Sequence, residues 1–320
     1  MVLKPLTKSD MKTKHLILSM ITVALVVVAC NKETNYGPGP ASLSPLRQIF
    51  ENNIAAATQS FNVNASTGGT VQGADGTTVV FVPNAFRYAD GTVVTGNVQV
   101  ELVEALTIAD MLFLNKQAVG NDNGTLKPLT SGGQIRLTAS QAGQPVKLAP
   151  GGSYVQIPSA NPDPQMELFS GTVDADGTII WDPFDGGGNL VIDSGAYAFP
   201  NDSLGWINCD YFGNWGGPLT TITVTVPQVH NDQNTIVWVV FPSINSITNI
   251  GGYDAGPSTF ATGTSYAAPV GMGVTLVSLA LINGDYYSSF TNSTLVVGHN
   301  ETITYQPTTL AQFNTDCQAL

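Results

Sequence analysis

Residues 97–102 read Asn-Val-Gln-Val-Glu-Leu, with an apolar side chain at every second position, and residues 134–139 (Gln-Ile-Arg-Leu-Thr-Ala) repeat this alternation. Because successive side chains of a strand point to opposite faces, a period of two predicts strands that bury one face. The tetrapeptide Ala-Asp-Gly-Thr occurs at 74–77, 89–92 and 175–178, between β-prone runs. Asp-Gly is typical of tight hairpin turns, so the sequence predicts an antiparallel β fold.

Two short helices are expected beside the strands. Ser44 followed by Pro45 is a good helix start. The apolar residues that follow recur on one helical face, at Leu46, Ile49, Phe50, Ile54 and Ala57. A second helix is predicted within 106–112, because Thr107 and Asp110 have the spacing of a capping box.

The second half of the chain has a different strand pattern. After a turn-rich break at 182–189, the runs 236–241 and 274–282 are apolar without alternation, which predicts central strands covered on both faces. Turns follow one another too closely for the crossover helices of a parallel α/β sheet. We therefore expect an all-β chain with two antiparallel β-sandwich domains in series, residues 44–190 with the N-terminal helix and residues 191–320.

The first 29 residues predict a lipoprotein signal peptide. A basic segment that starts at Met11 precedes the mostly apolar run 16–28, and Met11 is a better start than Met1. The apolar run is short for a membrane span. It ends in Val-Val-Ala-Cys, which resembles the bacterial lipobox, so Cys30 is the expected lipidation site. The alternatives are a cleaved signal with an incidental cysteine and a hydrophobic anchor.

The residues after Cys30 predict a tether and an acidic exported domain. Residues 30–43 are polar and rich in Gly and Pro, as a flexible tether requires. The chain has 23 acidic and 11 basic residues, a net charge of −12; after residue 29 the numbers are 22 and 7, or −15. Such a chain lacks the basic clusters that nucleic-acid binding needs. No cysteine and histidine spacing suits zinc, and no Gly-rich loop suits a nucleotide.

Two cysteines remain for the mature domain. Cys209 and Cys317 are an even pair in a chain expected to enter an oxidising compartment. They are a candidate disulfide; the alternative is two unrelated buried thiols.

Several segments resemble uncharacterised surface lipoproteins of Bacteroidota. The resemblance is carried by Gly-Thr-Val at 69–71, residues 77–86 and 91–98, and the short pieces 111–112, 129–133, 166–169 and 205–210. The first of these segments are more distantly similar to the β-sandwich shared by ankyrins and netrin receptors. The resemblance implies an extracellular scaffold or interaction domain with no assigned catalysis. The self-cleaving His-Phe-Ser step of some eukaryotic relatives is not carried over, because that tripeptide is absent here.

One segment resembles a protease motif. Gly-Thr-Ser-Tyr-Ala-Ala-Pro at 263–269 resembles the nucleophile segment of subtilisin-like proteases, and Asp193, His230 and Ser265 follow one another in the order of that triad. His230 lacks the expected flanking pattern and lies too close in sequence to Ser265 for that fold. A Gly/Ser/Thr loop leading into a strand is the preferred interpretation.

Two further clusters are candidate ligand sites. Trp206, Tyr211 and Trp215 lie in a Gly- and Asn-rich segment and are candidates for stacking on sugar rings; packing at the domain junction is the alternative. Asp174 and Asp176 are a weak candidate for Ca²⁺, although turn formation explains these aspartates better.

These patterns lead to one expected function. The protein is expected to be an outer-membrane lipoprotein of the cell envelope, possessing no enzymatic activity, that binds or scaffolds a glycan or protein partner. The alternatives are a carbohydrate-binding accessory protein that uses the 206–215 loop and, less favoured, a subtilisin-like hydrolase.

Overall fold

The computed structural model describes residues 44–174, 177–185 and 189–320. Within these ranges the chain is mostly β-strand, and the predicted all-β fold with a short N-terminal helix is confirmed. The predicted signal peptide, Cys30 and the whole predicted tether, residues 30–43, lie outside the described residues. No helix in the described ranges combines the length and apolarity needed to cross a membrane.

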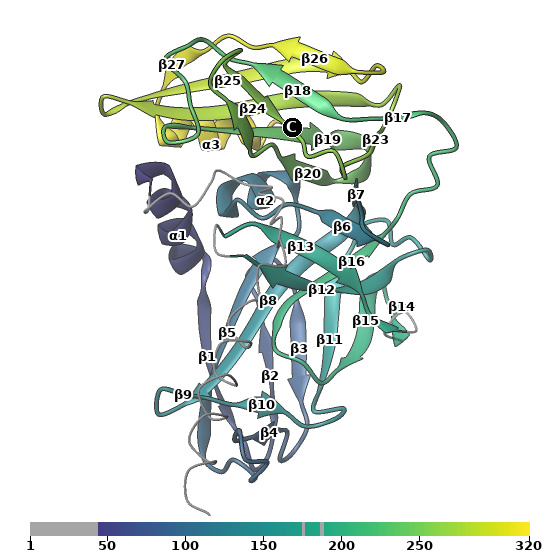
Figure 1. The fold of residues 1–320 in the computed structure, drawn as a ribbon. Coiled ribbons are helices and arrows are strands. Elements are labelled where there is room, and N and C mark those ends of the chain that lie inside the picture. The colour runs from purple at the N-terminus through teal and green to yellow at the C-terminus, as the bar shows by residue number, and fades with distance from the viewer. Residues whose placement is uncertain (1–43, 175–176, 186–188) are drawn as a thin grey trace, which may run out of the picture. The chain divides into compact units, whose positions relative to one another are not determined.

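Two sheets form the first sandwich (Figure 1). Sheet A has nine strands: β1 (Gln59–Asn64), β5 (Asn97–Ala105), β8 (Thr130–Gln141), β16 (Gly205–Tyr211), β12 (Glu167–Val173), β13 (Ile179–Pro183), β6 (Val119–Asp122) and β7 (Thr125–Pro128), with β9 (Gln144–Pro145) paired to β8. Sheet B has the order β14 (Val191–Asp193), β15 (Ala196–Asn201), β11 (Ser153–Pro158), β3 (Thr78–Phe81) and β2 (Gly69–Gln72). A small pair, β4 (Phe86–Arg87) and β10 (Lys147–Leu148), accompanies them.

The core between sheets A and B follows the alternation seen in the sequence. Val98, Val100 and Leu102 of β5 are fully buried against apolar residues of sheet B such as Val79 and Val155. The hairpin predicted at 74–77 joins β2 to β3, and Gly76 has the positive φ of 99° that this turn requires. The period-two pattern therefore predicted both the strands and the faces they bury.

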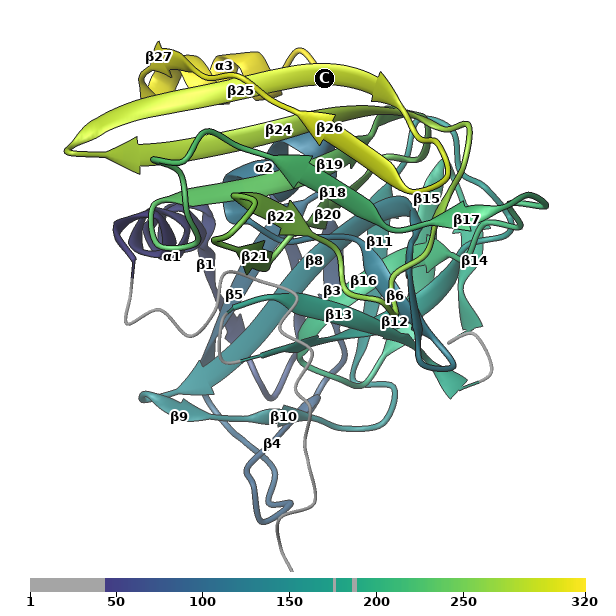
Figure 2. The ribbon, with the colours of Figure 1, turned by 45° about the horizontal axis from the view of Figure 1, so that its top comes forward.

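Two further sheets form the second part of the chain (Figure 2). Sheet C has the order β21 (Gly252–Asp254), β22 (Thr259–Ala261), β18 (Ile222–Thr225) and β26 (His299–Thr302). Sheet D has the order β20 (Ser246–Asn249), β19 (Thr235–Phe241), β24 (Gly273–Ile282), β25 (Asp285–Thr294) and β27 (Gln306–Thr308). The pair β17 (Leu219–Thr220) and β23 (Ala268–Pro269) and the short 3-10 helix η2 (Pro242–Ile244) complete this part.

Sheet D is covered on both faces, as the continuous apolar runs predicted. Val237, Val239 and Phe241 of β19 pack against sheet C. Ile236, Trp238 and Val240, the alternate residues of the same strand, belong to a different cluster that faces sheet A and the helices. Every residue of β19 is buried, because each face has its own apolar partner.

Three α-helices lie at the junction between the two parts. They are α1 (Pro45–Ala57), α2 (Ile108–Leu114) and α3 (Leu310–Cys317). The Ser44 hydroxyl caps α1, and Thr107 and Asp110 form the predicted capping box of α2. The buried apolar residues of all three helices join one cluster with residues from sheets A and D, which we call the junction cluster.

Two features of the pairing differ from expectation. The second sandwich was expected to begin at residue 191, but β14, β15 and β16 pair with strands of sheets A and B, so the pairing changes only after Tyr211. Two strand pairs, β6 with β13 and β18 with β26, are parallel, and an isolated parallel bridge joins Leu126 to Tyr266; the other pairs among the described strands are antiparallel. The β6–β7 hairpin also places Val119 and Leu126 in the core between sheets C and D, and the described residues belong to one compact unit, Asn35–Leu320.

We predict that Trp238→Ala lowers the free energy of unfolding by about 3–5 kcal/mol. The Trp238 ring contacts Phe50 of α1 and Phe313 of α3, and its indole Nε1 donates a hydrogen bond of 2.8 Å to Asn115 Oδ1 at the end of α2. Urea unfolding followed by circular dichroism measures the change. Gln48→Ala, on the exposed face of α1, is the control and should change stability by under about 0.5 kcal/mol. Equal stability of Trp238→Ala and wild type would contradict this role.

Candidate functional site

Trp206, the first of the three aromatic candidates, is a buried residue of β16. Only 8% of its surface is exposed, and it belongs to the junction cluster. Lys116 Nζ lies 6.0 Å from the centroid of its ring, and the Arg136 guanidinium carbon lies 5.8 Å from it. Both cations are within the range of a cation–π interaction. Trp206 therefore lies against a buried lysine and a half-buried arginine and offers no exposed face for a sugar.

The three candidate aromatic residues do not form one platform. Tyr211 is half-buried and packs on the core between sheets A and B. Trp215 packs on the core between sheets C and D, and a Cβ at Gly213 would lie 2.2 Å from its ring. The prediction that Trp206, Tyr211 and Trp215 stack together on a ligand is therefore wrong, because each ring packs on a different cluster.

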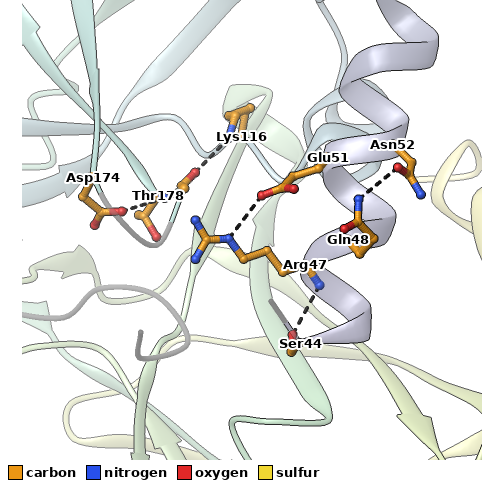
Figure 3. A network of polar contacts seen from close by, with 9 residues as sticks. Ser44, Arg47, Gln48, Glu51, Asn52, Lys116, Asp174 and Thr178 are labelled. Carbon is orange, nitrogen blue, oxygen red and sulfur yellow. Dashed lines mark hydrogen bonds and ion pairs between the residues drawn. The ribbon is translucent and has the colours of Figure 1, made fainter. Parts of the chain in front are cut away.

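Lys116 lies near a set of polar contacts along α1 and in the turn between β12 and β13 (Figure 3). Its Nζ donates a hydrogen bond of 2.8 Å to the Gly177 carbonyl, and only 6% of the residue is exposed. Burial, reinforced by the positive charge of Arg136, lowers the pKa of Lys116 to about 8. The lysine thus connects the turn between β12 and β13 to the segment that follows α2.

Two further contacts lie within α1 and within the turn between β12 and β13. Arg47 Nε lies 3.5 Å from Glu51 Oε1 along α1, and the Thr178 backbone N donates a hydrogen bond of 2.9 Å to Asp174 Oδ1 (Figure 3). Asp174 therefore stabilises a turn, the alternative preferred from the sequence. Asp176, the second residue of the weak calcium candidate, lies outside the described residues. Within those residues, no group of three or more His, Cys, Asp or Glu side chains is placed to hold a metal ion.

Two of the residues of the protease-like motif interact with other partners. The His230 ring stacks on Tyr305, with centroids 3.7 Å apart, and its Nδ1 pairs with Thr235 Oγ1 at 3.1 Å. The Asp193 carboxylate accepts a hydrogen bond from the adjacent Ser194 hydroxyl. Ser265 lies in the loop before β23, where its backbone carbonyl accepts a hydrogen bond from Leu126. The order of residues in the sequence therefore does not correspond to an Asp–His–Ser relay.

The two cysteines are free thiols in separate clusters. Cys209 is fully buried in the core between sheets A and B, and Cys317 of α3 is buried in the junction cluster. The candidate disulfide is therefore not formed, and the alternative of two unrelated buried thiols describes the structure. Burial raises the pKa of Cys209 well above its usual range and that of Cys317 to about 12.

A concave surface lies around α2. A hollow of about 580 Å³ is lined by Asp75 and Asp110 together with residues after β11 and at the end of α3. A neighbouring hollow of about 290 Å³ shares these two carboxylates and adds Glu104. Burial and the charges of Glu104 and Asp110 raise the pKa of Asp75. This surface attracts cationic groups and repels anions.

Glu104 and Asp210 are buried carboxylates that the sequence did not single out for a structural role. Glu104 accepts hydrogen bonds from the backbone nitrogens of Asp75 and Thr77, at 3.0 and 2.9 Å, and so orders the 74–77 hairpin. Asp210 accepts a hydrogen bond from Asn208 beside a bulge between β16 and β8, and burial raises the pKa of Asp210 well above its usual range. Glu104 is in phase with the buried residues Val98, Val100 and Leu102, so a carboxylate at a position where the alternation predicts an apolar side chain is the signal that could have identified it.

No known protein-family model matches the chain, and no curated protein matches it. The resemblance to Bacteroidota surface lipoproteins therefore stays a prediction from the sequence.

We predict that His230 makes stability pH-dependent between about pH 6.5 and 4. Burial lowers the pKa of His230 from 6.5 to about 4, so the folded state favours the neutral ring. As pH falls below 6.5 the unfolded chain takes up a proton that the folded chain does not, and stability decreases by up to about 1.4 kcal/mol per pH unit. Urea unfolding of wild type and His230→Gln across this range tests this, and a variant with an unchanged slope would contradict it.

We predict that neither Cys209 nor Cys317 is alkylated in the folded protein. Both thiols are buried, and their raised pKa values keep them protonated. In denaturant without a reductant, iodoacetamide should label both, as peptide mass spectrometry will show. Labelling that requires prior reduction would indicate a disulfide and contradict the structure.

Proposed function

We propose that the protein is a lipid-anchored, exported β-sandwich protein that acts as a binding or scaffold module at the cell envelope, in the outer membrane, and performs no catalysis. The observation that carries this proposal is the use of its buried polar and aromatic groups. His230, Lys116 and Trp206 each contact neighbours that hold loops, helices and sheets together. These polar and aromatic side chains therefore contribute to the stability of the fold.

The proposed localisation at the cell envelope is supported by the sequence alone. The apolar run 16–28 followed by Cys30 supports lipidation, and the polar residues 31–43 supply a spacer between a lipid and α1. A domain that is joined to a lipid through such a spacer reaches partners near the membrane surface without dissociating from it. These features together favour display of binding surfaces at the envelope.

We predict that intact mass of the protein from membranes includes a diacylglycerol-sized increment on Cys30. The Cys30→Ser variant should lack the increment, because the acceptor sulfur is gone. Its mature form should no longer be found in the membrane fraction. Protease treatment of whole cells reports whether the domain is displayed outside. Wild-type protein without lipid in the soluble fraction would refute the anchoring proposal.

The non-catalytic part of the proposal has a separate test. A fluorophosphonate probe, which labels activated serines, should leave the full-length protein unlabelled. Labelling that Ser265→Ala abolishes would overturn this part and support a hydrolase.

A further inference from the structure

The outward face of sheet B carries two rows of side chains without a charge. Strand register places one row across four strands, Thr70, Val80, Tyr154 and Pro200, and the next across five, Gln72, Thr78, Gln156, Ala198 and Val191. The residues between them, such as Val79 and Val155, point into the core. We call these two rows the sheet B face. Its Ala198 is covered by its neighbours, and its other residues are half-buried or exposed.

The polar side chains of this face have no hydrogen-bond partner among the described residues. They are Thr70, Gln72, Thr78, Tyr154 and Gln156. Each amide and each hydroxyl both donates and accepts. Val80, 39% exposed, and the Tyr154 ring lie side by side among them. The face therefore combines the adjacent Val80 and Tyr154 with hydrogen-bonding groups from Thr70 at one end of their row and from the neighbouring row.

From this arrangement we infer that the sheet B face binds a neutral oligosaccharide or polysaccharide chain, laid across the strands with Tyr154 under a sugar ring. This inference rests on the proposed binding function and names its ligand class and site. The C–H bonds of a sugar ring pack on an aromatic face, while its hydroxyls donate to and accept from Gln72, Thr78 and Gln156.

Charge favours a neutral ligand at this face. The chain after residue 29 carries −15, which repels polyanions, yet neither row contains an acidic or basic residue that would attract a cation. An uncharged polyol approaches without either effect. Its binding requires close contact and hydrogen bonds, which the two rows supply.

Size favours a narrow chain over a second copy of the protein. Strands lie about 4.8 Å apart and alternate residues about 7 Å apart, so the two rows cover roughly 19 Å by 14 Å, or on the order of 250 Å². A stable protein interface buries about 800 Å² on each partner. A single glycan chain needs only a strip of this width.

The test is affinity electrophoresis and calorimetry of the full-length lipoprotein, in detergent, with hydroxyethyl cellulose, galactomannan, xylan, dextran and laminarin, and with alginate as an anionic control. At least one neutral polymer should bind, and Tyr154→Ala should weaken that binding about tenfold or more. Tyr154→Phe should retain most of it, because the ring remains. Tyr287→Ala, which removes a half-buried strand tyrosine of sheet D, is the matched control and should bind like wild type.

Unfolding curves of the variants separate loss of binding from loss of fold, and Gln156→Ala, which removes a polar group from the same face, provides a second, milder variant. The inference is overturned if no neutral polymer binds, if Tyr154→Ala binds as wild type does, or if only alginate binds. It is also overturned if sedimentation shows a dimer that Tyr154→Ala dissolves. The lipidation and surface-display tests do not depend on any of these outcomes. The proposed function can therefore hold when the glycan inference fails, and the two results are distinguishable.

Discussion

The structure depends on the contacts of Trp238. This residue of β19 meets Phe50 of α1 at 5.8 Å, edge to face, and Phe313 of α3 at 6.2 Å. Its indole nitrogen bonds to Asn115, the left-handed residue that ends α2 and that also accepts a hydrogen bond from Asn249 of β20. One side chain therefore contacts all three helices. These contacts join the three helices to sheet D within the cluster that covers the facing sides of sheets A and D.

The junction also determines where the positive charges lie. Lys116 and Arg136, two of the six basic residues after position 43, contact the ring of Trp206 in the junction cluster. A buried cation requires partners, and here an aromatic face and the Gly177 carbonyl provide them. After residue 29 the chain has 22 acidic and only 7 basic residues, and one of the basic residues, Lys116, is buried. The long-range field of the protein is therefore set by its carboxylates.

The sequence predicted local structure well because local rules produced it. Alternation in 97–102 located a strand and its buried face, and the helix start at Ser44–Pro45 and the capping box of α2 appear as expected. The place where strand pairing changes was not predictable in this way. The segment 191–211 follows a turn-rich break, yet it returns to sheets A and B because β11 and β12 leave edges that it completes. Alternation indicates which face a strand buries, but it does not indicate which distant strand it pairs with.

The same limit explains the outcome for the candidate sites. Trp206 is bordered by Gly and Asn residues, which is typical of an exposed loop, but its strand position places the ring in the junction cluster. The sheet B face is the opposite case, because no sequence pattern predicted it and the fold assembles it. Its residues come from segments near 70, 80, 155 and 200, each with ordinary alternation, and only antiparallel register brings Thr70, Val80 and Tyr154 into one row.

A face of this kind needs a scaffold that does not yield when a ligand binds. Tyr154 and Gln156 alternate with Val155 and Ile157, which are fully buried against sheet A, so the outer side chains inherit the rigidity of the core. Sheet A is in turn fixed on its other face by the junction cluster. Sheet B is thus held in place by two packed layers: the core that it shares with sheet A, and the junction cluster with Trp238 on the other side of sheet A. A preorganised row loses little conformational entropy on binding, which is how weak individual contacts along a chain add up to useful affinity.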